Sequence, residues 1–526
     1  MSGSSTVTRR ISDFVKLGAA RNPAGEALVL GDSRWSYLEL QQRVDMLARA
    51  LLAAGVRKGD RVATLQTPHP QFLVSFLATA SVGAIWIGLN PKLRPDELAH
   101  VVVDAAPKIL LTRMRIGDRS YAREVEAMRD RFPDLERVIA FEEDAPEHGI
   151  EPMRHFLRGG ERISPAELRE ARDACGGRDP CLIVYTSGTT GKPKGAMLHH
   201  EGICRFALAQ NELWPVDPLR IVNYFPINHV GCTLDVCIPC LAAGGTIVFM
   251  EQFDPSGCLA LMVREKITLW ATVPSVFAMQ LALPDFRRAD LSSLKLIVWE
   301  GAAMPAQLVG ELLQVHPRLA TNYGMTETTS AITALEPTGD EELLAHSVGS
   351  AFAGVEIRLV DSGGRDVADG HEGEVLARSA LNMLGYWRND DATRAAFTDD
   401  GFFRTGDLAV RRPDGRYRLV GRLKEMFKSG GYNVYPREVE GVLEAHPAVA
   451  TVAVVAAPDP RWQEVGVAFI VPKAAVDEGG LRAWCAGRLS NYKVPKRFVI
   501  RDSLPLLPIG KVDKGALRAI AEALSL

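Results

Sequence analysis

Segments of strand length alternate with amphipathic segments along most of the chain, and this alternation constrains the fold more than any other feature. Residues 38–53, for example, place leucine and valine side chains at helical spacing. Short runs of β-branched and apolar residues flank such segments, as is typical of buried parallel strands. These runs are residues 60–65, 182–186, 245–250 and 294–299. The pattern predicts an α/β fold built on largely parallel sheets.

Residues 62–91 carry no formal charge and include a long apolar stretch. A membrane-spanning helix needs about 20 predominantly apolar residues. Here Pro68 and Pro70 precede the apolar stretch, and hydroxyl side chains such as Ser75 and Thr79 dilute it. We therefore predict a buried helix followed by a buried strand, and no membrane span.

The pattern changes near residue 350, where polar and apolar residues alternate between closely spaced turns. This alternation predicts an antiparallel β segment with strands at 355–360, 373–378 and 416–420. Helical and strand patterns then resume. The predicted helices are 438–445 and 480–489, and the predicted strands are 451–456 and 467–471. We place a domain boundary after Gly421, which gives domains of residues 1–421 and 422–526.

The composition is that of an ordinary globular protein with more than one domain. The 526 residues are 47% hydrophobic and 24% charged, which excludes a disordered, collagen-like or coiled-coil chain. A net charge of −3 gives no argument for nucleic acid as a partner. Eight cysteines are too few for a disulfide scaffold, and no secretory signal is visible. We expect a reducing compartment, the cytoplasm.

Three of the cysteines, Cys232, Cys237 and Cys240, copy part of an iron–sulfur ligand spacing. No fourth cysteine follows at a suitable place, and the surrounding residues are apolar. Since free cysteine is among the most buried residue types, we interpret these three as structural or pocket-lining.

The segment 185–195 carries the strongest chemical signal in the chain. It follows a predicted strand and precedes a helix-like segment. Its glycines allow close backbone approach to an anion, and its hydroxyl and lysine side chains add donors and charge, as a triphosphate requires. It is not a Walker A loop, because Thr186 and Pro193 stand where that pattern needs other residues.

This segment resembles the phosphate loop of the adenylate-forming superfamily, which includes acyl-CoA synthetases, peptide-synthetase adenylation domains and firefly-type luciferases. Other segments resemble further motifs of the superfamily in the same order. These segments are 225–229, 322–327, 403–407, 421–433 and 508–511. The resemblance covers about residues 10–520 and implies three parts: a large N-terminal domain of α/β sheets, a distorted antiparallel β-barrel subdomain within it, and a small mobile α/β C-terminal domain. The hinge would lie at Lys424.

The resemblance implies an ATP-dependent acyl-CoA synthetase, an acid–thiol ligase. A carboxylic acid and ATP would give acyl-adenylate and pyrophosphate, and CoA would then take the acyl group and release AMP. Thr186 and Glu327 would hold Mg²⁺, and Lys511 and His229 would complete the catalytic set. The implied ATP-binding residues are Thr186, Ser187, Gly188, Thr189, Thr190, Gly191, Lys194, Glu300, Gly301, Ala302, Asn322, Tyr323, Gly324, Thr326, Asp407, Arg422 and Lys511.

Two further sets follow from the resemblance, one for CoA and one for the acid. The C-terminal domain would rotate, so that Lys511 serves adenylation and the glycine-rich loop after Lys428 then faces the thiol. The CoA set is Lys428, Ser429, Gly430, Gly431, Trp462, Tyr492 and Lys496. The acyl-pocket set is His229, Val230, Gly231, Glu300, Thr329 and Ser330.

Several alternatives stay open at this level. Individually, Tyr323 suits a protein core, Asp407 a turn, and Trp462 or Tyr492 an ordinary surface. Glu300 would meet either a donor or cation on the acid, or else the adenine amino group or an internal Arg or Lys.

The acid itself is predicted only by class. The expected pocket positions contain no Arg, which argues against a dicarboxylate, and small residues leave room for a medium-chain, aromatic or alicyclic acid. An enzyme that loads a carrier protein and a luciferase-like oxidoreductase are the alternatives. The superfamily resemblance leaves a homodimer open.

Overall fold

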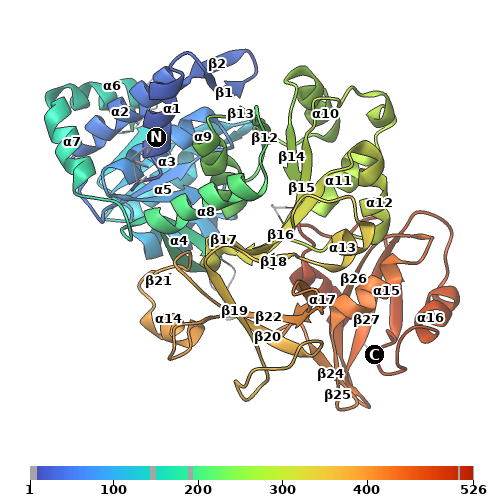
Figure 1. Ribbon diagram of the computed structural model, residues 1–526. Coiled ribbons are helices and arrows are strands. Elements are labelled where there is room, and N and C mark those ends of the chain that lie inside the picture. The colour runs from blue at the N-terminus through green and yellow to red at the C-terminus, as the bar shows by residue number, and fades with distance from the viewer. Residues whose placement is uncertain (1–8, 143–149, 187–192, 508–509, 525–526) are drawn as a thin grey trace.

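The computed structural model describes residues 9–142, 150–186, 193–507 and 510–524. Two large sheets form the N-terminal part, an antiparallel sheet follows, and a smaller sheet lies in the C-terminal part (Figure 1). None of the helices in the described ranges combines the length and hydrophobicity that crossing a bilayer requires.

The first large sheet has nine strands, and its centre is parallel. In spatial order the strands are β18 (Ser350–Ala351), β17 (Ser330–Ala334), β16 (Leu319–Met325), β15 (Leu296–Trp299), β14 (Leu269–Thr272), β12 (Arg220–Asn223), β13 (Thr246–Phe249), β1 (Glu26–Leu30) and β2 (Ser33–Ser36). At one edge β17 and β18 add in antiparallel fashion, so the chain turns back directly after β16.

The second large sheet has eight strands. In spatial order they are β21 (Gly385–Tyr386), β11 (Lys194–His199), β10 (Pro180–Thr186), β4 (Ile85–Leu89), β3 (Arg61–Leu65), β5 (Ile109–Thr112), β8 (Arg137–Ala140) and β9 (Glu151–Pro152). From β10 to β9 the strands are parallel, whereas β10, β11 and β21 pair antiparallel. A small separate hairpin joins β6 (Arg115–Ile116) and β7 (Arg119–Ser120).

The uncharged stretch folds as predicted, into a buried helix and a buried strand. It forms α3 (Pro70–Ser81) and β4, and every residue from Phe72 to Ser81 is buried. Helix α3 contacts β1 of the first sheet and β3, β4 and β10 of the second, so it lies between the two sheets. Apolar side chains all round its surface are therefore required.

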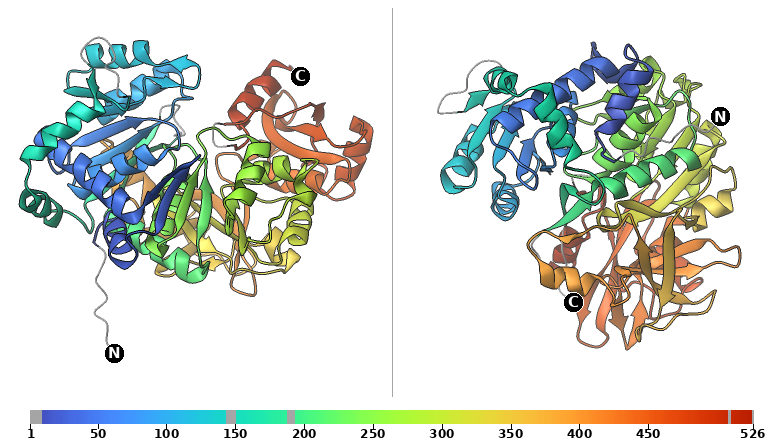
Figure 2. Two further views of the ribbon diagram at one scale, coloured as in Figure 1. Left: turned by 90° about the horizontal axis from the view of Figure 1, so that it is seen from above. Right: turned by 60° about the vertical axis from the view of Figure 1, so that its left-hand side comes forward.

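The remaining helices cover the sheets and connect their strands (Figures 1 and 2). In the N-terminal part they are α1 (Asp13–Arg21), α2 (Tyr37–Ala53), α4 (Pro95–Ala105), α5 (Ala122–Arg131), α6 (Met153–Gly159), α7 (Pro165–Asp173), α8 (His200–Leu213), α9 (Ile238–Ala243), α10 (Pro255–Arg264), α11 (Pro274–Leu281), α12 (Ala306–Val315), α13 (Glu341–His346) and α14 (Asp390–Ala396). Four short helical segments add to these: η1 (Gly160–Arg162), the π-helix η2 (Gly231–Cys237), η3 (Phe286–Arg288) and η4 (Thr326–Thr328).

The predicted antiparallel segment is a four-stranded sheet. Its strands are β19 (Val355–Val360), β20 (Glu372–Ser379), β22 (Phe403–Arg411) and β23 (Tyr417–Arg422). The C-terminal sheet follows, with β24 (Phe427–Ser429), β25 (Tyr432–Val434), β26 (Val449–Asp459), β27 (Gln463–Pro472) and β28 (Arg497–Ile500). Helices α15 (Pro436–Glu444), α16 (Glu478–Ala486) and α17 (Lys514–Ala523) pack with this sheet. Lys424 lies in the turn between the two sheets.

The C-terminal part docks on the side of the N-terminal part that contains β14 to β16 (Figure 2). The Ser275 hydroxyl donates to the carbonyl oxygen of Gly510 at 2.8 Å. The ammonium of Lys473 contacts the side-chain oxygen of Gln307. The first contact holds Gly510, the residue before Lys511, against the start of α11, which follows β14.

One prediction about the phosphate-loop segment was wrong. We expected the segment to lead into a helix, but residues 194–199 form β11, which pairs antiparallel with β10 through Thr186 and Lys194. Helix α8 begins only at His200. The described ends of the segment, Thr186 and Lys194, therefore belong to two paired strands, and β11 separates the segment from α8.

Backbone packing requires a glycine at position 324, a residue that the resemblance also places in the ATP-binding set. A Cβ atom at this position would lie 1.8 Å from the Ser330 carbonyl oxygen of the neighbouring β17. We expect Gly324→Ala to push β16 and β17 apart and to lower the free energy of unfolding by about 3 kcal/mol or more. Urea unfolding of purified protein measures the change.

Gly310 in α12 provides the matched control. There an added Cβ would lie 3.5 Å from a Glu341 side-chain oxygen, an ordinary contact. Gly310→Ala should leave stability unchanged or raise it by about 0.5–1 kcal/mol, because alanine favours helix interiors. Equal stability of the two variants would contradict the packing argument for Gly324.

Candidate active site

The predicted site residues follow the carboxyl ends of neighbouring parallel strands. His229 follows β12, Glu300 follows β15, and Asn322 lies in the last half of β16. Parallel strands end at one edge of a sheet, and this edge is where open α/β sheets bind ligands. Thr186, at the end of β10, faces the same region from the second sheet, because its side chain contacts Glu327 after β16.

The proposed metal ligands Thr186 and Glu327 lie together. The Thr186 hydroxyl donates to Glu327 Oε1 at 3.3 Å, and the Tyr386 hydroxyl donates to the same oxygen at 3.0 Å. Glu327 is 9% exposed. Hydroxyl and carboxylate oxygens are the hard ligands that Mg²⁺ prefers, and one carboxylate suffices when substrate phosphates supply the rest. These residues therefore fit a magnesium ion bound with ATP.

Tyr386 is a site residue that the sequence analysis missed. It belongs to β21, which pairs with β11, and the Lys194 ammonium lies 5.3 Å from the centre of its ring. A tyrosine that lies between the motifs 322–327 and 403–407 and belongs to neither gives no local signal. Only the pairing of β21 with the phosphate-loop hairpin brings it to Glu327.

A second cluster joins Tyr323, Asp407 and Arg422. The Tyr323 hydroxyl donates to Asp407 Oδ2 at 2.9 Å, and Arg422 Nε lies 2.8 Å from Asp407 Oδ1. Burial raises the pKa of Asp407, and the charge of Arg422 opposes this rise. Tyr323 is 8% exposed, so it belongs to the core as well as to the cluster. The arrangement presents a buried carboxylate beside an aromatic ring, and both residues belong to the ATP-binding set that the resemblance implied.

Lys511 reaches the same region from the C-terminal part. A Cβ atom at Gly301 would lie 2.9 Å from Lys511 Cε and 3.2 Å from its Nζ. Gly301 also has a φ of +81°, a conformation that favours glycine. Burial and the charge of Arg422 lower the pKa of Lys511, while Glu300, Asp407 and Asp235 oppose this change. The structure thus places a partly exposed lysine where the charges of three carboxylates act on it.

Glu300 bonds a neighbouring side chain. Asn322 Nδ2 donates to Glu300 Oε2 at 3.3 Å. Burial and the charge of Asp235 raise the pKa of Glu300 well above its usual range. Two residues of the predicted ATP-binding set, Glu300 and Asn322, are therefore paired with each other, and the charge of Lys511 acts on the carboxylate.

His229 is positioned as a neutral donor. Its Nδ1 accepts a hydrogen bond of 3.1 Å from the backbone N–H of Gly231, so Nε2 carries the proton. Burial and the nearby charge of Lys511 lower the pKa of His229 to about 3. The ring is therefore uncharged above about pH 4 and suits hydrogen bonding to a substrate, not proton transfer near neutral pH.

This pKa leads to a prediction about pH dependence. Because the imidazole stays neutral from pH 5 to pH 9, His229→Asn should lower kcat/KM for the acid by about tenfold at every pH in that range. Asparagine retains an acceptor for the Gly231 N–H. Steady-state profiles of both proteins check this. A change in kcat/KM near pH 6.5 that is present in the wild-type profile and absent from the variant profile would contradict the lowered pKa of His229.

The remaining predicted site residues fall into three groups. Ser187, Gly188, Thr189, Thr190 and Gly191 lie outside the described residues. Thr326, Val230, Thr329 and Ser330 are buried around the end of β16 and the start of η2, where Gly231 also lies. Ala302, exposed, follows Gly301 in the loop after β15.

The predicted CoA residues gather on the C-terminal part around the β24–β25 hairpin. Gly430, with a φ of +59°, donates its N–H to the Trp462 carbonyl at 2.8 Å, and Gly431 completes the turn. Lys496 lies 5.9 Å from the centre of the Trp462 ring. Tyr432, which we had not singled out, stacks on Tyr492 with ring centres 4.7 Å apart. Lys428 is exposed and Ser429 is buried in the same hairpin.

This CoA group lies away from Lys511. In Figure 1 the β24–β25 hairpin is at the lower end of the C-terminal part, far from β16. The two groups thus occupy different faces of one small domain, and the present arrangement places Lys511 at the site.

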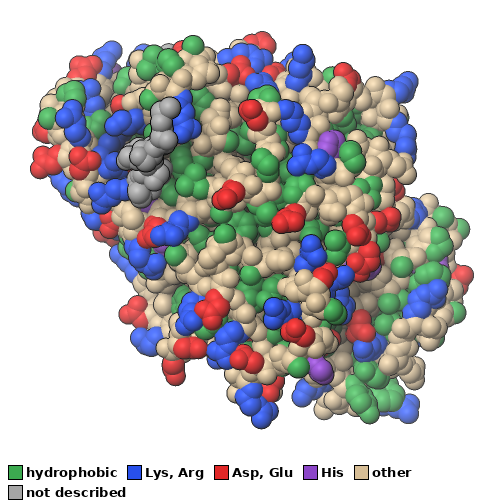
Figure 3. All heavy atoms as spheres, in the orientation of Figure 1, with side chains coloured by type: hydrophobic (Ala, Val, Ile, Leu, Met, Phe, Trp, Pro, Cys, Tyr) green, Lys and Arg blue, Asp and Glu red, His purple; other side chains and the backbone are tan. Residues whose placement is uncertain are grey.

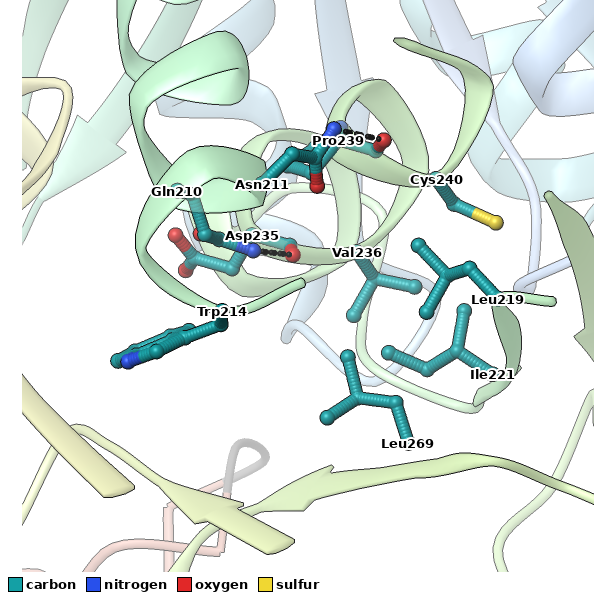
Figure 4. Close-up of a pocket in the computed structure, with 10 residues that line it drawn as sticks. All are labelled: Gln210, Asn211, Trp214, Leu219, Ile221, Asp235, Val236, Pro239, Cys240 and Leu269. Carbon is teal, nitrogen blue, oxygen red and sulfur yellow. Dashed lines mark hydrogen bonds between the residues drawn. The ribbon is translucent and has the colours of Figure 1, made fainter. Parts of the chain in front are cut away.

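The three cysteines of the apparent iron–sulfur spacing are buried. Asn223 Nδ2 lies 3.4 Å from Cys232 Sγ and 3.1 Å from Cys237 Sγ. Cys240 lines a small cavity (Figure 4). Among the described residues, no three His, Cys, Asp or Glu side chains form a group able to hold a metal ion.

Comparisons with known proteins agree with this geometry. Residues 15–387 match the AMP-binding enzyme family, and residues 438–511 match the AMP-binding enzyme C-terminal domain. A feruloyl-CoA synthase from an Amycolatopsis species is 37% identical over 508 residues, which cover 95% of this chain and 96% of that protein. An indoleacetate–CoA ligase from Aromatoleum aromaticum is 36% identical over 513 residues, which cover 97% of this chain and 98% of that protein.

A solved structure extends the comparison. The anthranilate CoA ligase AuaEII in complex with anthranoyl-AMP has a TM-score of 0.86 and 27% sequence identity, and each chain is covered to 100%. The chain therefore belongs to the AMP-binding enzyme family, within the adenylate-forming superfamily. It is an acid–thiol ligase of the acyl-CoA synthetase kind, and enzymes of this family use ATP and CoA.

Proposed function

We propose that this enzyme converts a medium-chain, aromatic or alicyclic carboxylic acid into its CoA thioester through an acyl-adenylate. The carboxylate attacks the α-phosphorus of ATP and displaces pyrophosphate. The thiolate sulfur of CoA then attacks the acyl carbon and displaces AMP. The observation that carries the proposal is the position of Lys511, whose ammonium lies against Gly301 after β15, where the charge of Glu300 acts on it.

Charge is the main difficulty of the first step, because a carboxylate must approach a phosphate. Lys511 would bridge the two anions and offset their repulsion. Thr186 and Glu327 would hold Mg²⁺, which supplies further neutralisation of the phosphate charge. Asp407 would accept the ribose hydroxyls, with Arg422 fixing its orientation. His229 would donate Nε2–H to the acid without changing its own charge.

The second step requires a different face of the C-terminal domain. We propose that residues 422–526 rotate about Lys424, which lies in the turn between β23 and β24. The rotation would withdraw Lys511 and bring the Gly430 turn with Trp462 and Tyr492 to the thiol. Tyr432 would join this set, since it stacks on Tyr492.

Small molecules are the proposed partners. On the face shown in Figure 3, Lys and Arg side chains are interspersed with Asp and Glu side chains, which suits no polyanion. Two relatives are named for ferulate and indoleacetate, both aromatic acids, and this supports an aromatic substrate. All eight cysteines are free and buried, in keeping with our proposal of a reducing cytoplasm.

Pyrophosphate release with Mg·ATP tests the proposal over a panel of aliphatic, aromatic and amino-bearing acids, with and without CoA. Release that rises with CoA for one acid, together with formation of its thioester, supports the proposed function. Pyrophosphate release that is the same with and without CoA for every acid contradicts it. A holo carrier protein would then replace CoA in the assay.

A further inference from the structure

Asp235 is a carboxylate at the acid site that the mechanism above does not use. It lies on the π-helix η2, whose other residues are all buried. Only Asp235 retains a partly accessible side chain, so it faces a cavity rather than packed atoms. A π-helix places residues differently from an α-helix and is frequent at functional sites.

The two carboxylate oxygens of Asp235 differ in their partners. Oδ1 accepts a hydrogen bond from the Ser330 hydroxyl. Ser330 has a φ of +76° and Thr329 before it a φ of +54°, a conformation that is strained for both residues. Oδ2 accepts no hydrogen bond from any residue in the described ranges. The strained backbone thus fixes one oxygen of the carboxylate and leaves the other available.

Gln210 on α8 supplies a second acceptor beside Asp235. Its side chain is 7% exposed, and Nε2 donates to the backbone carbonyl of Asp235 at 3.2 Å. This bond fixes the orientation of the amide, so Oε1 is the free end, and within the described part of the chain Oε1 has no donor. Figure 4 shows both side chains at the same cavity, whose other walls are mostly apolar. These walls are Asn211, Trp214, Leu219, Ile221, Val236, Pro239, Cys240 and Leu269.

Asp235 also lies next to the reacting end of the acid site. A Cβ atom at Gly231 would lie 3.2 Å from His229 Nδ1 and 3.9 Å from Asp235 Oδ2. Gly231 therefore separates the two side chains and leaves space between them. The charge of Lys511 acts on Asp235 as well as on Glu300. An acid whose carboxylate meets Lys511 and His229 would extend past Gly231 to Asp235.

We propose that Asp235, with Gln210, selects carboxylic acids that carry an N–H or O–H donor remote from their carboxylate. The inference rests on the proposed function and narrows its substrate class. A buried acceptor without a donor is costly, so an acid that supplies the donor is favoured over one that does not. A site built to hydrogen-bond a substrate rejects the analogue that lacks the donor by far more than a hydrophobic pocket rejects a change of size.

The test compares phenylpropanoates that carry a methyl, hydroxyl or aminomethyl group at the meta or para position. For the wild-type enzyme with CoA, we expect kcat/KM for a donor-bearing acid to exceed that for its methyl analogue by about a hundredfold or more. The hydroxyl and aminomethyl acids distinguish a neutral donor from a cation. Equal kcat/KM values for all analogues would overturn this inference but not the proposed function. Absence of CoA-dependent turnover with every acid would overturn the proposed function itself.

Two variants of Asp235 and one control locate the effect. Asp235→Leu should reverse the preference toward the methyl acid. Asp235→Asn preserves the size of the side chain and an acceptor for Ser330. It should lower the ratio of kcat/KM for a donor-bearing acid to kcat/KM for its methyl analogue by at least about tenfold. The test therefore does not depend on the folding of the leucine variant. Val236→Ala changes an apolar wall of the same cavity and should alter all acids alike. An unchanged ratio in both Asp235 variants would overturn the assignment.

Discussion

Lys511→Ala is expected to abolish adenylation, with a fall of about a thousandfold or more in acid-dependent pyrophosphate release. The charges of Glu300, Asp407 and Asp235 act on the Lys511 ammonium at the site, and its removal leaves these carboxylates and the phosphate without their opposing charge. The second half-reaction should survive, because the rotated domain would present other residues. The rate of thioester formation from synthetic acyl-adenylate and CoA should therefore remain within about threefold of the wild-type rate, which is less than the tenfold change that 1.4 kcal/mol produces.

Lys473→Ala is the matched control for this experiment. Lys473 also belongs to the C-terminal part and also contacts the N-terminal part, through Gln307. It lies outside the site, so its loss tests domain docking without removing the catalytic charge. Both half-reactions should stay near wild-type values in this variant. Equal loss of both half-reactions in Lys511→Ala would contradict a role confined to adenylation.

The parts of the fold that sequence patterns predicted are those with a local signal. The uncharged stretch predicted a buried helix and a buried strand, and these are α3 and β4. The signal is local because a helix between two sheets must be apolar on every side. The alternation after residue 350 predicted β19, β20 and β23 of the antiparallel sheet, where one face is buried, but it did not predict β22. The resemblance of the motifs predicted that Thr186, Glu327, Tyr323 and Asp407 belong to one site. In the structure Thr186 lies within hydrogen-bond distance of Glu327, and Tyr323 of Asp407.

The parts that could not be predicted depend on pairing between distant segments. Strand β11 forms because β10 and β21 flank it, and nothing in residues 194–199 distinguishes a strand from the first turn of α8. Tyr386 reaches Glu327 through the same pairing. Asp235 was missed because the acid pocket was expected at Val230 and Gly231, directly after His229. The π-helix turns a residue four positions further on toward the same space.

Glu327→Gln is expected to lower adenylation by about a hundredfold and to raise the Mg²⁺ concentration required for half-maximal rate. Glutamine has the size of glutamate and still offers an oxygen to the hydroxyls of Thr186 and Tyr386, which bond Glu327 at 3.3 and 3.0 Å. The fold should therefore be preserved, and the loss reports the charge alone. Glu342→Gln, which changes an exposed carboxylate paired with Arg412, should leave the Mg²⁺ dependence unchanged.

A double-mutant cycle then asks whether Thr186 and Glu327 act on one ion. Thr186→Val removes the hydroxyl at nearly constant volume, and on its own it should also raise the Mg²⁺ requirement. If both side chains bind the same ion, the double variant will lose less than the product of the two single losses, because the second change acts on a site already weakened. Independent losses that multiply, measured as pyrophosphate release at saturating ATP and acid, would show that the hydroxyl and the carboxylate serve different purposes.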